Sequence, residues 1–225
     1  IKKCLFSVIN QKKNKNSYNI IFVDDKSVDK SLLIAKKILK KFENSLIIEN
    51  KSNLGLIKSC NKAIKNCRTD YFIRVDSDDY ISKYLIFYFE KTLKEKKYDL
   101  ISCKRVNFKN KKMKKINISE KNIDLFKLVS CGVALKTKKV KDIGMYKNML
   151  WEEYDLYLRY LKKNQKNIKI INRYLYYYRK HNRSMSSKKI WIKKAWKQLI
   201  KKYGKKKLLY FGKLPINLMG NINKL

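Results

Sequence analysis

Apolar residues in the first eighty positions recur at two spacings. Short apolar runs rich in β-branched and aromatic residues are typical of strands, and apolar residues three or four apart are typical of helices. The predicted strands are 18–23, 45–49 and 71–75, and the predicted helices are 1–11, a segment capped by Ser27 or Asp29, and 56–67. This alternation indicates an α/β fold with a doubly wound, mostly parallel sheet.

The pattern continues less regularly after residue 80. The sequence predicts helices at 83–96, 125–129 and 151 to about 163, strands at 99–103, 133–135, 168–171 and 174–178, and a basic hairpin or loop at 104–118. A catalytic domain over 1–186 is then followed by a basic helical extension over 187–225. The extension carries one apolar face, made of Trp191, Ile192, Ala195, Trp196, Leu199, Ile200 and Tyr203. Such a helix either lies at a membrane surface or docks on the domain.

An acidic cluster follows the 71–75 strand, which is expected to be buried on both faces. Asp76, Asp78 and Asp79 lie within four positions, where carboxylates repel one another unless they are solvated or neutralised. Their hard oxygens suit Mg²⁺ or Mn²⁺, and ligands of open α/β sheets gather beyond the carboxyl ends of strands. A metal site is therefore one interpretation, and a solvated acidic turn is the other.

Composition changes this picture in only a few ways. Among 225 residues, 44% are hydrophobic and 12% aromatic, which is enough for a folded globule despite a net charge of +39. All but seven of the 57 basic residues are lysines, and they are dispersed along the chain. We interpret this as a general compositional bias that attracts sugar nucleotides, acidic lipids and nucleic acid alike. Five cysteines without a CxxC pair favour a reducing cytoplasm over a disulfide or zinc framework.

Six stretches together resemble an inverting family 2 glycosyltransferase of the GT-A fold. They are Ser7–Gln11 (SVINQ), Ile21–Asp29 (IFVDDKSVD), Asn53-Leu54-Gly55 with Asn61-Lys62-Ala63, Asp76–Asp79, Glu152–Arg159 (EEYDLYLR) and Tyr178-Arg179-Lys180-His181. Each stretch is weak alone, but their order and spacing are specific. The resemblance covers residues 4 to about 186.

The resemblance implies a nucleotide-sugar site. Asp24 and Asp25 would contact the uracil and ribose of the donor, Asn53 and Gly55 would shape the nucleotide pocket, and Asp76 would hold the ribose. Helix capping and an ordinary turn are the structural alternatives for these residues.

The resemblance also implies a metal on the diphosphate. Asp78, together with Asp79, would hold Mg²⁺ or Mn²⁺, His181 would reach the metal or the diphosphate, and Arg179 would bind phosphate. The structural alternative for a single histidine is a satisfied surface or core residue.

Catalysis would need a carboxylate base that takes the proton of the acceptor hydroxyl. Glu153 stands where the family usually has Asp, so we predict Glu153 as the base, with Asp155 and Glu152 as alternatives. The longer side chain departs from the family pattern. Complementing the dipole of their own helix is the structural alternative for all three carboxylates.

We therefore predict a metal-dependent inverting transferase that moves a sugar from a nucleotide-sugar, expected to be a UDP-sugar, to a glycan or lipid-linked acceptor in surface polysaccharide synthesis. It would work in the cytoplasm, with the basic surface at the anionic inner face of the membrane. The alternatives are a catalytically inactive relative that binds or scaffolds, and a basic nucleic-acid-binding protein. Dispersed lysines and the lack of a binding motif argue against a specific nucleic-acid partner.

One expected strand is missing. Family members begin with a strand that runs between those at 18–23 and 71–75, whereas this sequence opens with a helix at Ile1. The sequence is then either a fragment of a longer enzyme or forms an imperfectly closed sheet, and we expect it to be inactive or weakly stable. Adding an upstream strand should raise the melting temperature and donor affinity, because it pairs two open edges. An extended chain that melts and binds like the present one would contradict this.

Overall fold

The structure is a computed structural model that describes residues 1–13, 17–110, 112–120, 124–128, 131–161, 167–181 and 189–212. Its helices are α1 (Lys2–Ile9), α2 (Ser31–Leu39), α3 (Leu56–Asn66), α4 (Leu85–Glu95), α5 (Thr137–Asp142), α6 (Glu152–Tyr160), α7 (Lys189–Tyr203) and α8 (Lys205–Phe211), with a 3₁₀ helix η2 (Leu125–Lys127). Its strands are β1 (Ile20–Asp24), β2 (Ser45–Glu49), β3 (Tyr71–Ile73), β4 (Tyr80–Ile81), β5 (Leu100–Lys109), β6 (Lys112–Ile116), β7 (Ala134–Lys136) and β8 (Ile168–Arg179).

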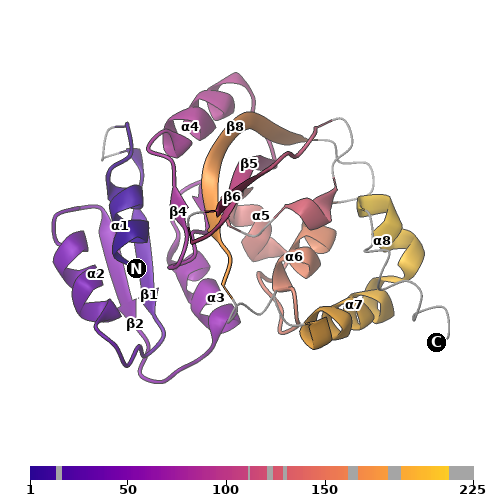
Figure 1. Cartoon of the computed structure of the whole chain (residues 1–225), viewed down its shortest axis with the longest axis horizontal. Helices are drawn as coiled ribbons and strands as arrows, with labels where there is room; N and C mark the ends of the chain where they lie inside the picture. The colour runs from indigo at the N-terminus through magenta and orange to yellow at the C-terminus, as the bar shows by residue number, and fades with distance from the viewer. Residues whose placement is uncertain are drawn as a thin grey trace.

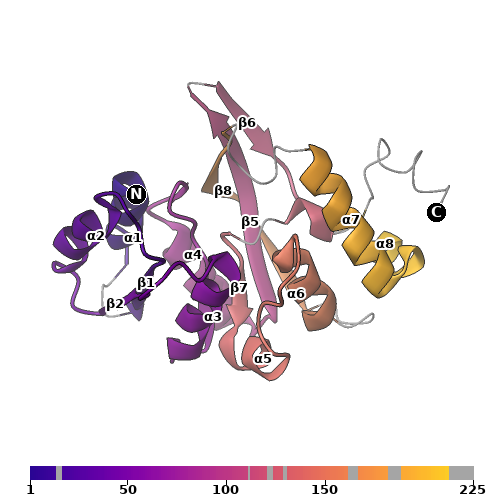
Figure 2. The ribbon, with the colours of Figure 1, turned by 90° about the horizontal axis from the view of Figure 1, so that it is seen from below.

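The strands form two separate sheets (Figure 1). β1 and β2 make a two-stranded parallel sheet, which packs with α1 and α2 at one end of the molecule. The larger, six-stranded sheet has the order β3-β7-β5-β8-β4, with β6 paired to β5. Seen from below, this sheet lies between the β1–β2 sheet and the helices α6, α7 and α8 (Figure 2).

A cavity separates β1 from β3. It has a volume of about 1050 Å³ and is lined by residues of both strands, including Phe22 and Ile73. In the described part of the chain, β1 pairs only with β2, and β3 pairs only with β7. The prediction that 71–75 is buried on both faces is therefore wrong: every residue of β3 is only partly buried, because this strand borders the cavity.

The expected α/β architecture is confirmed, but the larger sheet is mixed rather than mostly parallel. β5 runs parallel to β8, whereas the pairs β3·β7, β5·β7, β4·β8 and β5·β6 are antiparallel. The strand–helix–strand spacing that predicts parallel neighbours ends after β3. After β3, a short connection joins β5 to β6 as the antiparallel hairpin expected at 104–118. The other antiparallel pairs, β3·β7, β5·β7 and β4·β8, join strands that are distant in the sequence, so no local spacing predicts their direction.

Most predicted elements are present, with differences at their ends. The two strands predicted at 168–171 and 174–178 are one strand, β8, whose register against β5 shifts between them. The helix predicted at 125–129 is the 3₁₀ helix η2. The helix predicted from 151 ends at Tyr160, and the predicted end near 163 lies outside the described residues. Three elements have too few residues for a periodic signal and were not predicted: β4, α5 and α8.

The terminal helices dock on the domain. Trp196, Leu199, Leu208 and Phe211 belong to the same core cluster as Leu156 and Tyr160 of α6. Trp196 is 2% exposed and contacts the rings of Phe126 and Trp151. Of the two alternatives for this apolar face, the structure therefore favours docking on the domain, because most of the face packs inside the protein. No helix in the described ranges is long and apolar enough to span a bilayer, and the predicted boundary at 186/187 lies outside those ranges.

One buried carboxylate joins α7 to α6. Asp155 is completely buried; its Oδ1 accepts hydrogen bonds from Lys202 Nζ at 2.6 Å and Tyr203 OH at 2.5 Å, and its Oδ2 accepts from Arg159 Nε at 2.8 Å. Burial alone would raise the pKa of Asp155, but these three donors outweigh it and lower the pKa. The contacts of Asp155 therefore stabilise the packing of α7 against α6.

Asp155→Ala should lower the free energy of unfolding by about 3 kcal/mol, because it leaves the largely buried Arg159 without its carboxylate and removes the hydrogen bonds to Lys202 and Tyr203. Since the pKa of Asp155 is lowered in the folded state, its contribution is present at neutral pH and is lost as the pH falls through the acid range. Urea denaturation at several pH values measures both effects.

Asp142→Ala is the matched control, because Asp142 forms an exposed ion pair with Lys138 four residues away. Such pairs contribute less than about 1 kcal/mol. Equal losses for the two variants would contradict a structural role for Asp155.

Candidate active site

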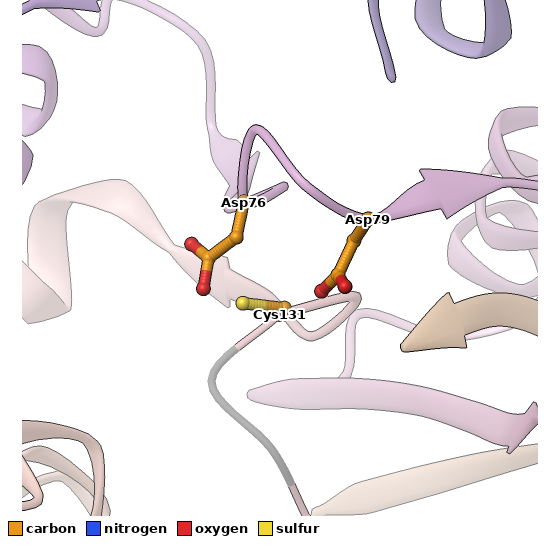
Figure 3. Close-up of side chains that lie close together, drawn as sticks. All are labelled: Asp76, Asp79 and Cys131. Carbon is orange, nitrogen blue, oxygen red and sulfur yellow. The ribbon is translucent and has the colours of Figure 1, made fainter. Parts of the chain in front are cut away.

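The predicted acidic cluster forms the turn between β3 and β4. Asp76 and Asp79 lie at the two ends of this turn, above Cys131 on a neighbouring segment (Figure 3). Asp79 N donates to Asp76 O at 3.0 Å, which closes the turn. The turn holds its three carboxylates in different environments.

Arg74 neutralises two of the carboxylates. Its Nε and Nη2 donate to the two oxygens of Asp76 at 2.8 and 3.3 Å, and its Nη1 donates to Glu152 Oε1 at 3.0 Å. The Arg74 side chain is 12% exposed, so these contacts are poorly screened by solvent. Asp76 and Glu152 are thereby fixed in place, although they are 76 positions apart in the sequence and belong to different elements.

Asp79 faces the protein interior. It is 2% exposed, and its carboxylate accepts hydrogen bonds from Tyr176 OH at 2.6 Å and from the backbone N of Arg179 at 2.7 Å. Burial raises the pKa of Asp79 to about 7. These contacts attach the turn to β8. The side chain of Arg179 is exposed and does not line either of the two cavities described here.

Asp78 points the other way, toward His181. Asp78 Oδ2 lies 2.9 Å from His181 Nε2, and both side chains are more than one third exposed. Both residues line a second cavity, of about 830 Å³. A carboxylate oxygen and an imidazole nitrogen at the rim of a cavity form a donor set that suits Mn²⁺ or a similar divalent ion.

Cys131 is a neighbour that the sequence did not indicate. Ligand atoms of Asp76, Asp79 and Cys131 lie within 4.8 Å of one another, the one such three-residue group found in the described ranges (Figure 3). However, Asp76 is paired with Arg74, and Asp79 accepts from Tyr176 and from Arg179 N. A thiol is also a soft ligand that does not suit Mg²⁺ or Mn²⁺, so Asp78 and His181 fit such an ion better than this group does. No sequence spacing relates Cys131 to the acidic turn.

Asp24 is the last residue of β1 and Asp25 follows it, and both line the first cavity. Asp24 is 4% exposed; its Oδ2 accepts from Ser27 N at 3.1 Å, and its Oδ1 has no hydrogen-bond partner among the residues described. A buried oxygen without a donor is costly, which makes Asp24 a candidate acceptor for a ligand N–H or O–H group.

Asp25 organises the turn that precedes α3. Its Oδ1 accepts from Asn50 Nδ2 and Leu54 N, and its Oδ2 accepts from Gly55 N at 2.8 Å. Desolvation would raise the pKa of Asp25, but these bonds lower it. Gly55 adopts φ 82°, a conformation that favours glycine. Asn53 is exposed and lines neither cavity.

Glu153 lies in the first turn of α6 and lines the second cavity. Burial, followed by repulsion from Glu152, raises the pKa of Glu153. The preceding residue, Trp151, has φ 56° and ψ 54°, a left-handed conformation that costs a tryptophan on the order of 1 kcal/mol or more. Packing of Trp151 against Tyr154 and Trp196 holds this conformation.

The two cavities share Arg74, Asp76 and Asp78 in their linings. The first also contains Asp24 and Asp25, and the second also contains Glu152, Glu153 and His181. The structure therefore brings these predicted residues to one continuous region. It places the carboxylates of Asp79 and Asp155 in the interior, and Asn53 and Arg179 at the surface.

A match to a protein-family model shows which family this chain is related to. The family model of Glycosyl transferase family 2 matches residues 1–145, more than half of the chain. The chain belongs to this family.

Two relatives in family 2 concern teichoic acids. The chain is 37% identical over 126 residues to the poly(ribitol-phosphate) beta-glucosyltransferase of Bacillus spizizenii, covering 56% of this chain and 20% of that protein. It is 26% identical over 197 residues to the teichoic acid poly(glycerol phosphate) polymerase of Staphylococcus epidermidis, covering 78% of this chain and 26% of that protein. The match to this chain thus covers only 20% and 26% of the length of these two relatives.

Solved structures share the fold of this family 2 chain. S. aureus TarS 1–349 in complex with UDP-GlcNAc superimposes with a TM-score of 0.74 at 19% identity, covering 92% of this chain and 66% of that one. The mannosyltransferase PcManGT from Pyrobaculum calidifontis, in complex with GDP-Man and Mn²⁺, gives a TM-score of 0.68 at 13% identity, covering 96% and 61%. At these identities the likeness establishes the architecture.

Proposed function

We propose that the chain transfers a sugar from a nucleotide-sugar, with inversion, to a hydroxyl of an anionic glycan-type acceptor. The observation that carries this proposal is the meeting of three acidic segments, 24–25, 76–78 and 152–153, along two cavities with a common wall. The Arg74 bridge accounts structurally for Asp76 and Glu152. It does not account for Asp24, Asp78 and Glu153, which a nucleoside, a cation-bridged diphosphate and a catalytic base would need together.

The first cavity would hold the nucleoside of the donor. Asp24 Oδ1, buried without a described donor, would accept a hydrogen bond from the base, and Asp25 would act indirectly by fixing the Leu54–Gly55 turn. Asp76, held by two bonds from Arg74, would accept from the ribose hydroxyls. The TarS complex with UDP-GlcNAc supports a uridine donor.

Asp78 and His181 would hold a divalent metal, since their ligand atoms lie 2.9 Å apart and both residues line the second cavity, with Asp78 also lining the first. When bound, the metal would supply Lewis-acid stabilisation of the departing diphosphate. The PcManGT complex with Mn²⁺ favours this assignment. Asp79 would contribute by anchoring the turn to β8 rather than by binding the ion.

Glu153 would be the catalytic base. The acceptor hydroxyl attacks the anomeric carbon from the face opposite the diphosphate; the new C–O bond forms as the sugar–phosphate bond breaks, and the hydroxyl proton passes to the Glu153 carboxylate. Glu152 is neutralised by Arg74, and Asp155 is saturated by three donors, so neither competes for this proton. The raised pKa makes Glu153 a stronger base than an ordinary carboxylate.

The names of the relatives favour a phosphate-containing polymer as acceptor. A chain with a net charge of +39 would attract such a polyanion at long range. The cytoplasmic location inferred from cysteine usage stays a prediction, as does any contact with a membrane surface.

Glu153→Gln should reduce the transfer rate by about 10²–10⁴-fold, because it removes the base but keeps the shape of the side chain. In the unmodified protein the rate should rise with pH across the neutral range, since Glu153 acts only when deprotonated and its pKa is raised. Initial rates of UDP release from a panel of UDP-sugars, measured at several pH values, test both.

Glu120→Gln is the control, because Glu120 is bound to Lys169 and Ile170 away from the cavities. Full activity of the Glu153→Gln variant would rule out Glu153 as the base. Binding of UDP without turnover in the unmodified protein would favour the inactive relative instead.

Asp78→Asn should weaken the binding of UDP in the presence of Mn²⁺ by about tenfold or more, because the ion loses a charged ligand. Calorimetric titration with UDP, with and without Mn²⁺, measures the change, and Asp142→Asn on exposed α5 provides the charge-matched control. An unchanged metal dependence in Asp78→Asn would contradict the assignment. Tighter binding of a random oligonucleotide than of UDP at 0.2 M salt would favour the nucleic-acid interpretation.

A further inference from the structure

Helix α7 presents two different stripes. One consists of Trp196 and Leu199, which are buried in the core with the partly buried Ile192. The other consists of Trp191, Lys194, Ala195 and Gln198, which line the second cavity together with Glu152 and Glu153. Their spacing of three, four and seven positions places them on one side of the helix.

The second stripe is held rigidly relative to the proposed base. Gln198 Oε1 accepts a hydrogen bond from Leu150 N at 3.1 Å, which fixes the segment just before Trp151 and α6. At the end of α7, Lys202 and Tyr203 both donate to Asp155 of α6. These contacts set the distance between the stripe and Glu153 without involving either Trp191 or Lys194.

Trp191 and Lys194 are therefore available for a ligand. Trp191 is 43% exposed, although it lines a cavity, and Lys194 is exposed one helical turn further on. An indole face packs well against the C–H groups of a sugar or polyol, and a lysine ammonium pairs with phosphate. Lys58 lines the same cavity and adds a second positive charge.

The second cavity is lined by groups of both charges. Asp78 and Glu153 line it together with Asp76 and Glu152, which are paired with Arg74, and Lys58 and Lys194 line it as well. A neutral acceptor would gain nothing from the two lysines. An acceptor that carries phosphate beside its reacting hydroxyl would pair with them and be oriented with its hydroxyl toward Glu153.

We propose that the α7 stripe of Trp191 and Lys194 is the acceptor subsite, and that it recognises a phosphodiester-linked polyol through an indole–polyol contact and an ammonium–phosphate pair. The role of this stripe as an acceptor subsite rests on the proposed transferase function. The binding of the acceptor fragment is nevertheless a separate event that can be measured without donor or turnover.

The test is direct binding of a short poly(glycerol phosphate) oligomer by calorimetry at moderate salt, in the absence of nucleotide. Trp191→Ala should weaken binding by about tenfold, as expected for loss of an aromatic stacking partner, and Lys194→Gln by about three- to fivefold, as expected for loss of a partly exposed ion pair. UDP affinity should stay unchanged in both variants, because Asp24 and Asp25 line the first cavity, which neither Trp191 nor Lys194 lines.

Lys193→Gln and Lys197→Gln are matched controls, because both lysines are exposed on α7 and line neither cavity. They should bind the oligomer like the unmodified protein. Equal weakening in the controls would mean diffuse attraction by charge and would overturn the subsite.

Two further outcomes would also overturn it. The first is no oligomer binding by a protein that binds UDP, and the second is equal binding of a neutral glucose oligomer of the same length. Failure to bind UDP would count against the transferase proposal instead, and the oligomer titration would still report on the subsite.

Discussion

Arg74 is the contact on which the arrangement of the site depends. Its guanidinium group, largely shielded from solvent, binds Asp76 in the turn after β3 and Glu152 at the start of α6. Without it, Asp76 and Glu152 would face each other's charge in a region where solvent screens little. Arg74 also lies 5.7 Å above the ring of Tyr146, which packs into the core beside α6. The bridge therefore joins two parts of the fold and sets the electrostatics of the cavity between them.

The acidic residues fall into two groups: those whose charge is satisfied by neighbouring side chains, and those that remain at the cavity wall. Asp76 and Glu152 are neutralised by Arg74, and Asp79 and Asp155 are saturated by hydrogen bonds in the interior. Asp78 and Glu153 remain at the cavity wall, where they would bind a metal and accept a proton, respectively. The same distinction explains why a strongly basic chain can maintain an acidic site: its positive charges are mostly on the surface, and few of them reach the cavity.

The sequence was informative where a signal is local. The acidic turn, the strand before it and the helix at 56–66 follow from hydrophobic spacing, and the ordered motifs identified the family. Burial was not accessible in the same way, because it depends on distant partners. Nothing near Asp79 indicates that Tyr176 and Arg179 enclose it, and nothing near Asp155 indicates that Lys202 and Tyr203 do so.

The terminal helix shows the same limit. Hydrophobic spacing predicts one apolar face over residues 191–203 that includes both Trp191 and Trp196. In the structure, Trp196 is buried in the core and Trp191 lines the second cavity. Hydrophobic spacing alone does not distinguish a core contact from a ligand platform, because both use aromatic residues. Only the position of α6 separates them.

The unbridged space between β1 and β3 has a dynamic consequence. The two sheets share no backbone ladder in the described part of the chain, and α1 and α3 provide contacts between them. We therefore expect each sheet to open as its own cooperative unit. Amide protons of the small sheet are thus expected to exchange with solvent through a less costly opening than those of β5 and β8. A nucleotide bound across the space would order both units at once, so part of its binding free energy would be used to suppress their relative motion.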